Sequence, residues 1–92
     1  MGRENELKSK REYQKECEEY LRKKLDKLPE FEKQLMEELE GKYGFWVTVE
    51  TAMKITGKSR STIYKYKDDN CFIYRQSERK ISIYTKSLIL VL

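Results

Sequence analysis

The side chains best suited to binding a ligand lie close together, between residues 58 and 65. Each of them has its own hydrogen-bond donor, on a basic or hydroxyl side chain; they are Lys58, Ser59, Arg60, Ser61, Thr62, Tyr64 and Lys65. An arginine can donate two hydrogen bonds to a guanine edge, and serine or threonine can contact bases or phosphates. A second basic group follows, made of Arg75, Arg79 and Lys80. Its charges suit contacts with phosphates.

The same inventory argues against catalysis. The sequence has no histidine, so the commonest general base and metal ligand is missing. Its two cysteines, Cys17 and Cys71, are far apart in the sequence and form no CxxC pair. We therefore expect a protein that is not an enzyme and that holds neither a metal nor a cofactor.

Composition and length also indicate where the chain acts. A chain rich in lysine and glutamate, with no secretory signal, is expected in the cytoplasm, where thiols stay reduced. The longest apolar run, residues 88–92, is far too short to cross a bilayer, so we expect no membrane partner.

Charge is divided unequally along the 92 residues, which are enough for one modest core. Residues 1–44 carry 11 basic and 12 acidic side chains, whereas residues 45–92 carry 9 basic and 4 acidic ones. A basic half of this kind is typical of a surface that meets phosphates. We therefore divide the chain into a helical extension, 1–44, and a second domain, 45–92.

Two helices are predicted in the extension. Apolar residues recur at spacings of three and four from Glu4 to Lys27 and again from Glu30 to Glu40, with Pro29 between the two stretches and Gly41 as a stop. Their apolar stripes can close as an antiparallel hairpin. The outer face of the second helix is acidic, which suits solvent or a protein better than DNA; its glutamates are Glu30, Glu32, Glu37, Glu38 and Glu40.

Residues 48–67 have the pattern of two short helices joined by a tight turn. Thr48 and Ser59 are natural N-caps for helices over 49–56 and 60–67. Gly57 can adopt the positive φ that the turn requires. The polar residues named above then fall on or next to the second helix, with several on its outward face.

This stretch resembles the excisionase/MerR-type winged helix-turn-helix family. The matching residues are Thr48, Val49, Ala52, Lys54, Gly57, Ser59, Arg60, Ser61, Thr62, Tyr64 and Lys65. The resemblance covers roughly residues 46–88 and implies that the second helix enters the major groove of DNA, while a following β-hairpin wing contacts the backbone or minor groove. Met53 and Lys58 depart from the pattern, where a second alanine and a valine are usual.

The wing that the resemblance requires is present in the sequence. Residues 71–75 and 80–84 are rich in β-formers and are joined by residues 76–79. Arg75, Arg79 and Lys80 are expected near its tip. Thr85 can cap a final helix over residues 86–92, or this segment can be a strand; its apolar side chains complete a core or are offered to a partner.

These features together predict an α+β fold, mostly helical, with an N-terminal helical hairpin followed by a winged helix-turn-helix with a two-stranded wing. The function expected is that of a small DNA-binding protein from a mobile genetic element, accessory to a replication or recombination enzyme. A sequence-specific transcriptional regulator or an excisionase-type recombination directionality factor is the alternative. The sequence does not decide between duplex and single-stranded DNA.

A protein partner is also expected, either a polymerase, helicase or recombinase, or a second copy of the chain. The helical extension is predicted to be its docking element, although the extension can equally serve only to support the core of the second domain. Apolar or aromatic residues left outside the predicted stripes are the candidate contacts, and they are Leu7, Tyr20, Met36, Leu90 and Leu92.

Overall fold

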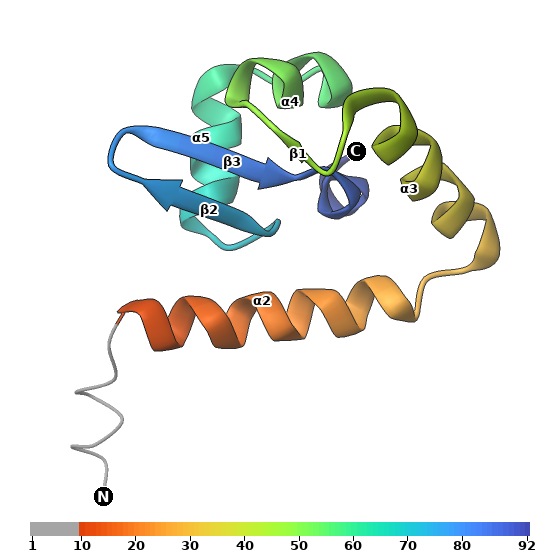
Figure 1. The fold of residues 1–92 in the computed structure, drawn as a ribbon, viewed down its shortest axis with the longest axis horizontal. Helices are drawn as coiled ribbons and strands as arrows, with labels where there is room; N and C mark the ends of the chain where they lie inside the picture. Colours follow the sequence, from red (N-terminus) through yellow and green to blue (C-terminus); the bar gives the residue numbers. More distant parts are fainter. Residues whose placement is uncertain (1–9) are drawn as a thin grey trace, which may run out of the picture.

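The computed structural model describes residues 10–92 (Figure 1). In chain order its elements are α2 (Lys10–Asp26), α3 (Glu30–Tyr43), β1 (Trp46–Val47), α4 (Val49–Thr56), α5 (Arg60–Asp68), β2 (Tyr74–Ser77), β3 (Lys80–Tyr84) and the 3-10 helix η1 (Thr85–Val91). This is a mostly helical α+β fold, as predicted.

The strands form one antiparallel sheet in the order β1-β3-β2. Strand β3 pairs with β2, from Tyr74 opposite Ile83 to Ser77 opposite Lys80. It also pairs with β1 through Trp46 and Val47. The two-residue turn between β2 and β3 contains Glu78 at φ 54°. The alternation expected for a half-buried strand is seen in β3, where Ile81 and Ile83 are buried and Ser82 and Tyr84 are half-buried.

A first core lies between the sheet and the two short helices. Ile63 of α5, Ala52 of α4, Ile83 of β3 and Phe72 are almost completely buried there. Leu88 of η1 belongs to the same cluster. One side of the apolar C-terminal segment therefore completes this core, as one of the two sequence interpretations expected.

A second core joins α2 and α3 to the C-terminal segment. Leu21 and Leu25 of α2 and Met36 of α3 are buried around Ile73, whose side chain is fully buried. Ile89 and Leu90 of η1 pack against the same cluster.

The predicted antiparallel hairpin of α2 and α3 is not what forms. Figure 1 shows that α3 runs steeply away from α2, with the C-terminal helix η1 between the two helices. Their buried residues Leu21, Leu25 and Met36 instead meet around Ile73, with Ile89 and Leu90 of η1 packed against the same cluster. Phe31 and Tyr13 are expected in the contacts between the two apolar stripes, but they are 77% and 56% exposed.

Two element boundaries also differ from the prediction. Helix α3 continues through Gly41 to Tyr43 and ends at Gly44, which has φ 91° and donates its amide to the Glu40 carbonyl. Strand β2 begins at Tyr74 instead of Cys71. Just before the strand, the Ile73 carbonyl accepts from the Tyr84 amide at 2.8 Å, but the Ile73 amide donates to the buried Ser87 hydroxyl at 2.9 Å.

The C-terminal segment forms a 3-10 helix, which starts one residue earlier than the predicted helix. Thr85 does not cap it; the Thr85 hydroxyl is buried and donates to the Gly44 carbonyl at 2.6 Å. The Ser87 hydroxyl donates to the Tyr84 carbonyl at 2.7 Å while it accepts from Ile73. Two buried hydroxyls thus hold η1 against both cores through satisfied hydrogen bonds.

Candidate nucleic-acid interface

Two capped helices carry the polar residues that the sequence singled out. The Thr48 hydroxyl accepts from the Thr51 amide at 3.2 Å at the start of α4. Gly57 ends α4 in the left-handed conformation at φ 71°, and its amide donates to the Met53 carbonyl. A side chain with a Cβ is strained in that conformation, so glycine permits the short turn that brings α5 across α4.

The Ser59 hydroxyl caps α5 and is engaged within the protein. It accepts from the Thr62 amide at 3.3 Å and lies 2.9 Å from the Thr62 hydroxyl. The Ser61 hydroxyl is 3.2 Å from the Ser59 hydroxyl oxygen. Ser59 and Thr62 therefore stabilise the beginning of the helix, whereas Ser61 is exposed beside them.

An open hollow brings α5 and the β2–β3 turn together. Arg60 and Tyr64 of α5 line it on one side, and Arg79 and Lys80 line it on the other. Four of the ten predicted DNA-contact residues therefore face one space, although they come from segments about 15 to 20 positions apart in the sequence. The start of α4 and Ile81 complete the lining.

Glu50 is the acidic member of this hollow. Its carboxylate accepts a hydrogen bond from the Arg60 guanidinium at 2.8 Å, and both side chains are well exposed. The Arg60 hydrogen bond holds the pKa of Glu50 below its ordinary value, and Glu50 in turn raises the pKa of Arg60. Arg60 therefore has an acidic partner that an incoming phosphate or base would have to replace.

The other predicted residues of α5 and its turn lie outside the hollow. Ser61 and Lys65 are exposed and four residues apart, so they share one outward face of the helix. Lys58 is half-buried in the turn, where its backbone amide donates to the Thr56 hydroxyl at 3.2 Å.

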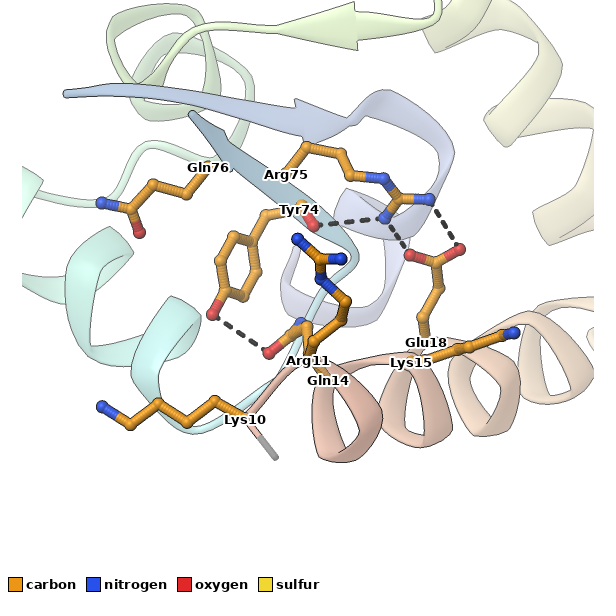
Figure 2. A pocket seen from close by; sticks show the side chains of 8 residues that line it. All are labelled: Lys10, Arg11, Gln14, Lys15, Glu18, Tyr74, Arg75 and Gln76. Atoms are coloured by element: carbon orange, nitrogen blue, oxygen red, sulfur yellow. Dashed lines mark hydrogen bonds and ion pairs between the residues drawn. The ribbon is translucent and has the colours of Figure 1, made fainter. Parts of the chain in front are cut away.

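Arg75 is directed away from the turn and toward α2. Its guanidinium forms a two-pronged ion pair with the Glu18 carboxylate, and the second of these contacts is 3.0 Å long (Figure 2). It also lies 5.4 Å from the centre of the Trp46 ring. The sequence places Arg75 with Arg79 and Lys80 near the tip of the hairpin, and the structure instead uses it to attach α2 to the sheet.

Two carboxylates that matter here are not identifiable from the sequence. Glu50 stands out there only as a favourable charge in the first turn of α4, and Glu18 is one of many glutamates in a charged helix. Glu50 is paired with Arg60 of the next helix, and Glu18 with Arg75, which is far along the chain. No local signal marks such a pair, because its geometry depends on how the helices cross.

The Glu18 ion pair makes stability depend on pH. The Arg75 hydrogen bond, aided by Arg22, holds the pKa of Glu18 below its ordinary value of 4.5. A carboxyl whose pKa is lower in the folded state stabilises the fold above the unfolded pKa, and this contribution is lost as the pH falls through the folded pKa.

We expect Glu18→Gln to lower the free energy of unfolding by about 1–2 kcal/mol at neutral pH, and by much less below the folded pKa. Urea unfolding followed by the fluorescence of Trp46 measures this difference. Glu19→Gln, one position away on the exposed side, is the control with the same change of charge. Parallel pH profiles for wild type and Glu18→Gln would contradict the role of the pair.

The candidate partner contacts have different environments. Tyr20 and Leu92 are 66% and 52% exposed. Leu90 is half-buried against the second core, and Met36 is 7% exposed inside it. Met36 is thus a core residue and not a surface contact, since α3 turns it toward Ile73. Leu7 lies outside the described residues.

The acidic face of α3 is smaller than predicted. Glu30, Glu37 and Glu38 are exposed. Glu40 is half-buried, and its carboxylate lies 3.7 Å from the Lys86 ammonium of η1. Phe31 is exposed on the same helix as the remaining glutamates.

Comparison of the chain with protein-family models, with curated protein sequences and with solved structures gives no match. The resemblance to the excisionase/MerR-type family therefore stays a prediction from the residues quoted above. No helix within residues 10–92 is long and apolar enough to cross a membrane. The same residues contain no group of three or more histidine, cysteine or acidic side chains placed to hold a metal ion.

Proposed function

We propose that the chain is a DNA-binding protein with a winged helix-turn-helix, in which α5 lies in the major groove and the β2–β3 hairpin contacts the sugar-phosphate backbone. The observation that carries this proposal is the hollow in which Arg60 and Tyr64 face Arg79 and Lys80. A hollow with three cations on two elements suits a phosphate backbone that passes between a helix and a hairpin.

The order of the elements supports the same proposal. Two capped helices with a tight glycine turn are followed by a two-stranded antiparallel hairpin, as the family resemblance requires. The outward face of α5 carries Ser61 and Lys65, which are exposed donors. Such residues contact base edges or phosphates when a helix enters a groove.

We further propose that the protein acts as an accessory subunit of a replication or recombination enzyme of a mobile genetic element. Exposed Phe31 and Tyr20 lie on the two helices outside the hollow, and Phe31 is accompanied by exposed glutamates. Large exposed aromatic side chains suit protein contacts, and phosphates would be repelled by the glutamates of α3. The transcriptional regulator or directionality factor is the alternative, and a strong preference for one duplex sequence would favour it.

The hairpin turn provides the test of DNA binding. Arg79→Ala combined with Lys80→Ala is expected to weaken binding to duplexes of any sequence and to reduce the slope of log K against log salt by about one for each phosphate that the variant no longer neutralises. Fluorescence anisotropy over a potassium chloride series measures both quantities. Single-stranded DNA in a parallel series shows which form is preferred.

A matched control for this variant is Lys23→Ala combined with Lys27→Ala, which removes the same charge from exposed positions at the other end of the molecule. Unchanged affinity and slope for the hairpin variant would count against the hairpin as a DNA contact. An equal weakening in the control would show that only the total charge matters.

A further inference from the structure

A groove of about 600 Å³ lies between α2 and β2, apart from the hollow beside α5. Four basic side chains and one acidic side chain line it, together with Gln14, Tyr74 and Gln76. The charged residues are Lys10, Arg11, Lys15, Glu18 and Arg75. In Figure 2 the Arg11 guanidinium extends from α2 into the space below β2, and Lys10 and Gln76 lie on opposite sides of its open end.

The groove has a fixed framework at one end. Glu18 is paired with Arg75 and Arg22, so its charge is compensated within the protein. The Tyr74 hydroxyl donates to the Gln14 side-chain oxygen at 3.1 Å. These contacts hold α2 against β2 at the closed end, and among residues 10–92 no ion pair forms at Lys10, Arg11 or Lys15. Within the part of the chain that the structure describes, the groove therefore keeps a net positive charge.

A further cation stands at the β2 side of the groove. The Lys67 ammonium of α5 lies 3.5 Å from the Gln76 side-chain oxygen and 5.4 Å from the centre of the Tyr74 ring. Its own carboxylate partner, Asp68, is at 3.2 Å and is largely exposed to solvent. Because Asp68 compensates the Lys67 charge, the uncompensated positive charge of the groove comes from its α2 wall.

The near-zero net charge of residues 1–44 conceals this feature. At 3.6 residues per turn, positions 10, 11, 14, 15 and 18 form one side of α2. Glu12, Glu16 and Glu19 fall on the opposite side of the helix. In the N-terminal half of α2 the basic side chains therefore gather on the side turned toward β2, with Glu18 as the acidic residue among them.

The groove and the hollow flank the same hairpin. Gln76 belongs to the groove, and Ser77, the next residue, pairs across the ladder with Lys80 of the hollow. Cross-strand partners lie about 5 Å apart, so a nucleic-acid strand that contacts the hairpin turn reaches the groove within a few phosphates.

From this geometry we infer that the α2–β2 groove binds the phosphodiester backbone of DNA beyond the segment contacted by α5 and the hairpin. The inference rests on the proposed DNA binding and extends it to a second surface. Helix α2 then has two roles on one side, because Leu21 and Leu25 in its C-terminal half complete a core and the basic residues of its N-terminal half hold the flanking backbone.

The test replaces Lys10, Arg11 and Lys15 by glutamine in the full chain. The control triple replaces Lys23, Lys24 and Lys27 by glutamine; these lie on the same helix or at its end and are exposed away from the groove. Binding to a long random-sequence duplex is measured by anisotropy over a potassium chloride series, and circular dichroism confirms that each variant is folded. We expect the groove triple alone to reduce the salt slope by about two to three.

The outcomes separate this inference from the proposed function. If the groove triple binds like wild type while Arg79→Ala/Lys80→Ala binds more weakly, the hairpin contacts DNA and the groove inference is wrong. An equal reduction in both triples also overturns it, since net charge alone would then explain the weaker binding. If the wild-type chain binds neither duplex nor single strand, the proposed function itself fails.

Discussion

Deleting residues 1–40 is expected to unfold the remaining chain, because α2 and α3 supply three of the four buried side chains of the second core. Without them the fully buried Ile73 is deprived of Leu21, Leu25 and Met36 as neighbours and is exposed to water. The Glu18–Arg75 ion pair and the Gln14–Tyr74 hydrogen bond disappear as well. A small domain is stable by only about 5–15 kcal/mol, so a deletion of this extent is not tolerated.

A single substitution tests the same dependence without removing any backbone. Leu25→Ala is expected to lower the free energy of unfolding by about 2–5 kcal/mol, as for other leucines truncated in a core. Tyr20→Ala, on the exposed side of the same helix, is the control and should change stability little. Urea unfolding of the three proteins, followed by Trp46 fluorescence, gives the comparison.

These results also decide what the helical extension is for. If the shortened chain folds and binds DNA but no longer holds a partner, the extension is a docking element. If it unfolds, and Leu25→Ala is strongly destabilising, the extension is part of the structural core. The packing around Ile73 favours the second outcome. Surface variants of the exposed Tyr20 and Phe31 then test partner binding separately from folding.

The C-terminal half is predictable to the extent that local signals define it. Thr48, Gly57 and Ser59 mark the ends of α4 and α5, because caps and positive-φ turns depend on residue type and immediate neighbours. The alternation in β3 similarly follows from period-two burial. These elements form within one or two residues of the predicted bounds.

The features that the sequence does not predict depend on contacts between distant segments. The stripes of α2 and α3 are equally compatible with packing on one another or on η1, and only the position of Ile73 between them selects the second arrangement. Strand β1 has two residues, too few for a periodic signal. Glu18 and Glu50 look like ordinary surface charges until the folded chain brings an arginine to each.

The same limit applies to the extent of the candidate site. Arg60, Tyr64, Arg79 and Lys80 are predicted together, and they share one hollow. Arg75 joins that predicted group through sequence proximity alone. Arg75 pairs across the ladder with Ser82 and its guanidinium reaches Glu18 of α2, so nearness to Arg79 in the sequence does not place it beside the hollow.

Arg60 should have the largest effect of any single residue on recognition. If it reads a base in the major groove, Arg60→Ala is expected to lower affinity for a selected duplex by about 10- to 100-fold and to relax the sequence preference at one position. Binding to a scrambled duplex should change much less, which distinguishes a reader from a phosphate contact. Lys65→Ala, on the same helix, is the comparison variant. Equal weakening on both duplexes would show that Arg60 contacts only the backbone.

Glu50 provides the reciprocal measurement, because its carboxylate is paired with Arg60 at 2.8 Å and, in the proposed complex, would compete with DNA for this guanidinium. Glu50→Gln removes a negative charge from the hollow and releases the guanidinium, so we expect tighter binding and an unchanged melting temperature, since exposed ion pairs contribute little to stability. The double variant with Arg60→Ala separates the two causes. If Glu50 acts by occupying Arg60, Glu50→Gln should tighten binding clearly less in the Arg60→Ala background than in wild type. An equal gain in affinity in both backgrounds would mean that Glu50 only repels phosphates and does not act by occupying the Arg60 guanidinium.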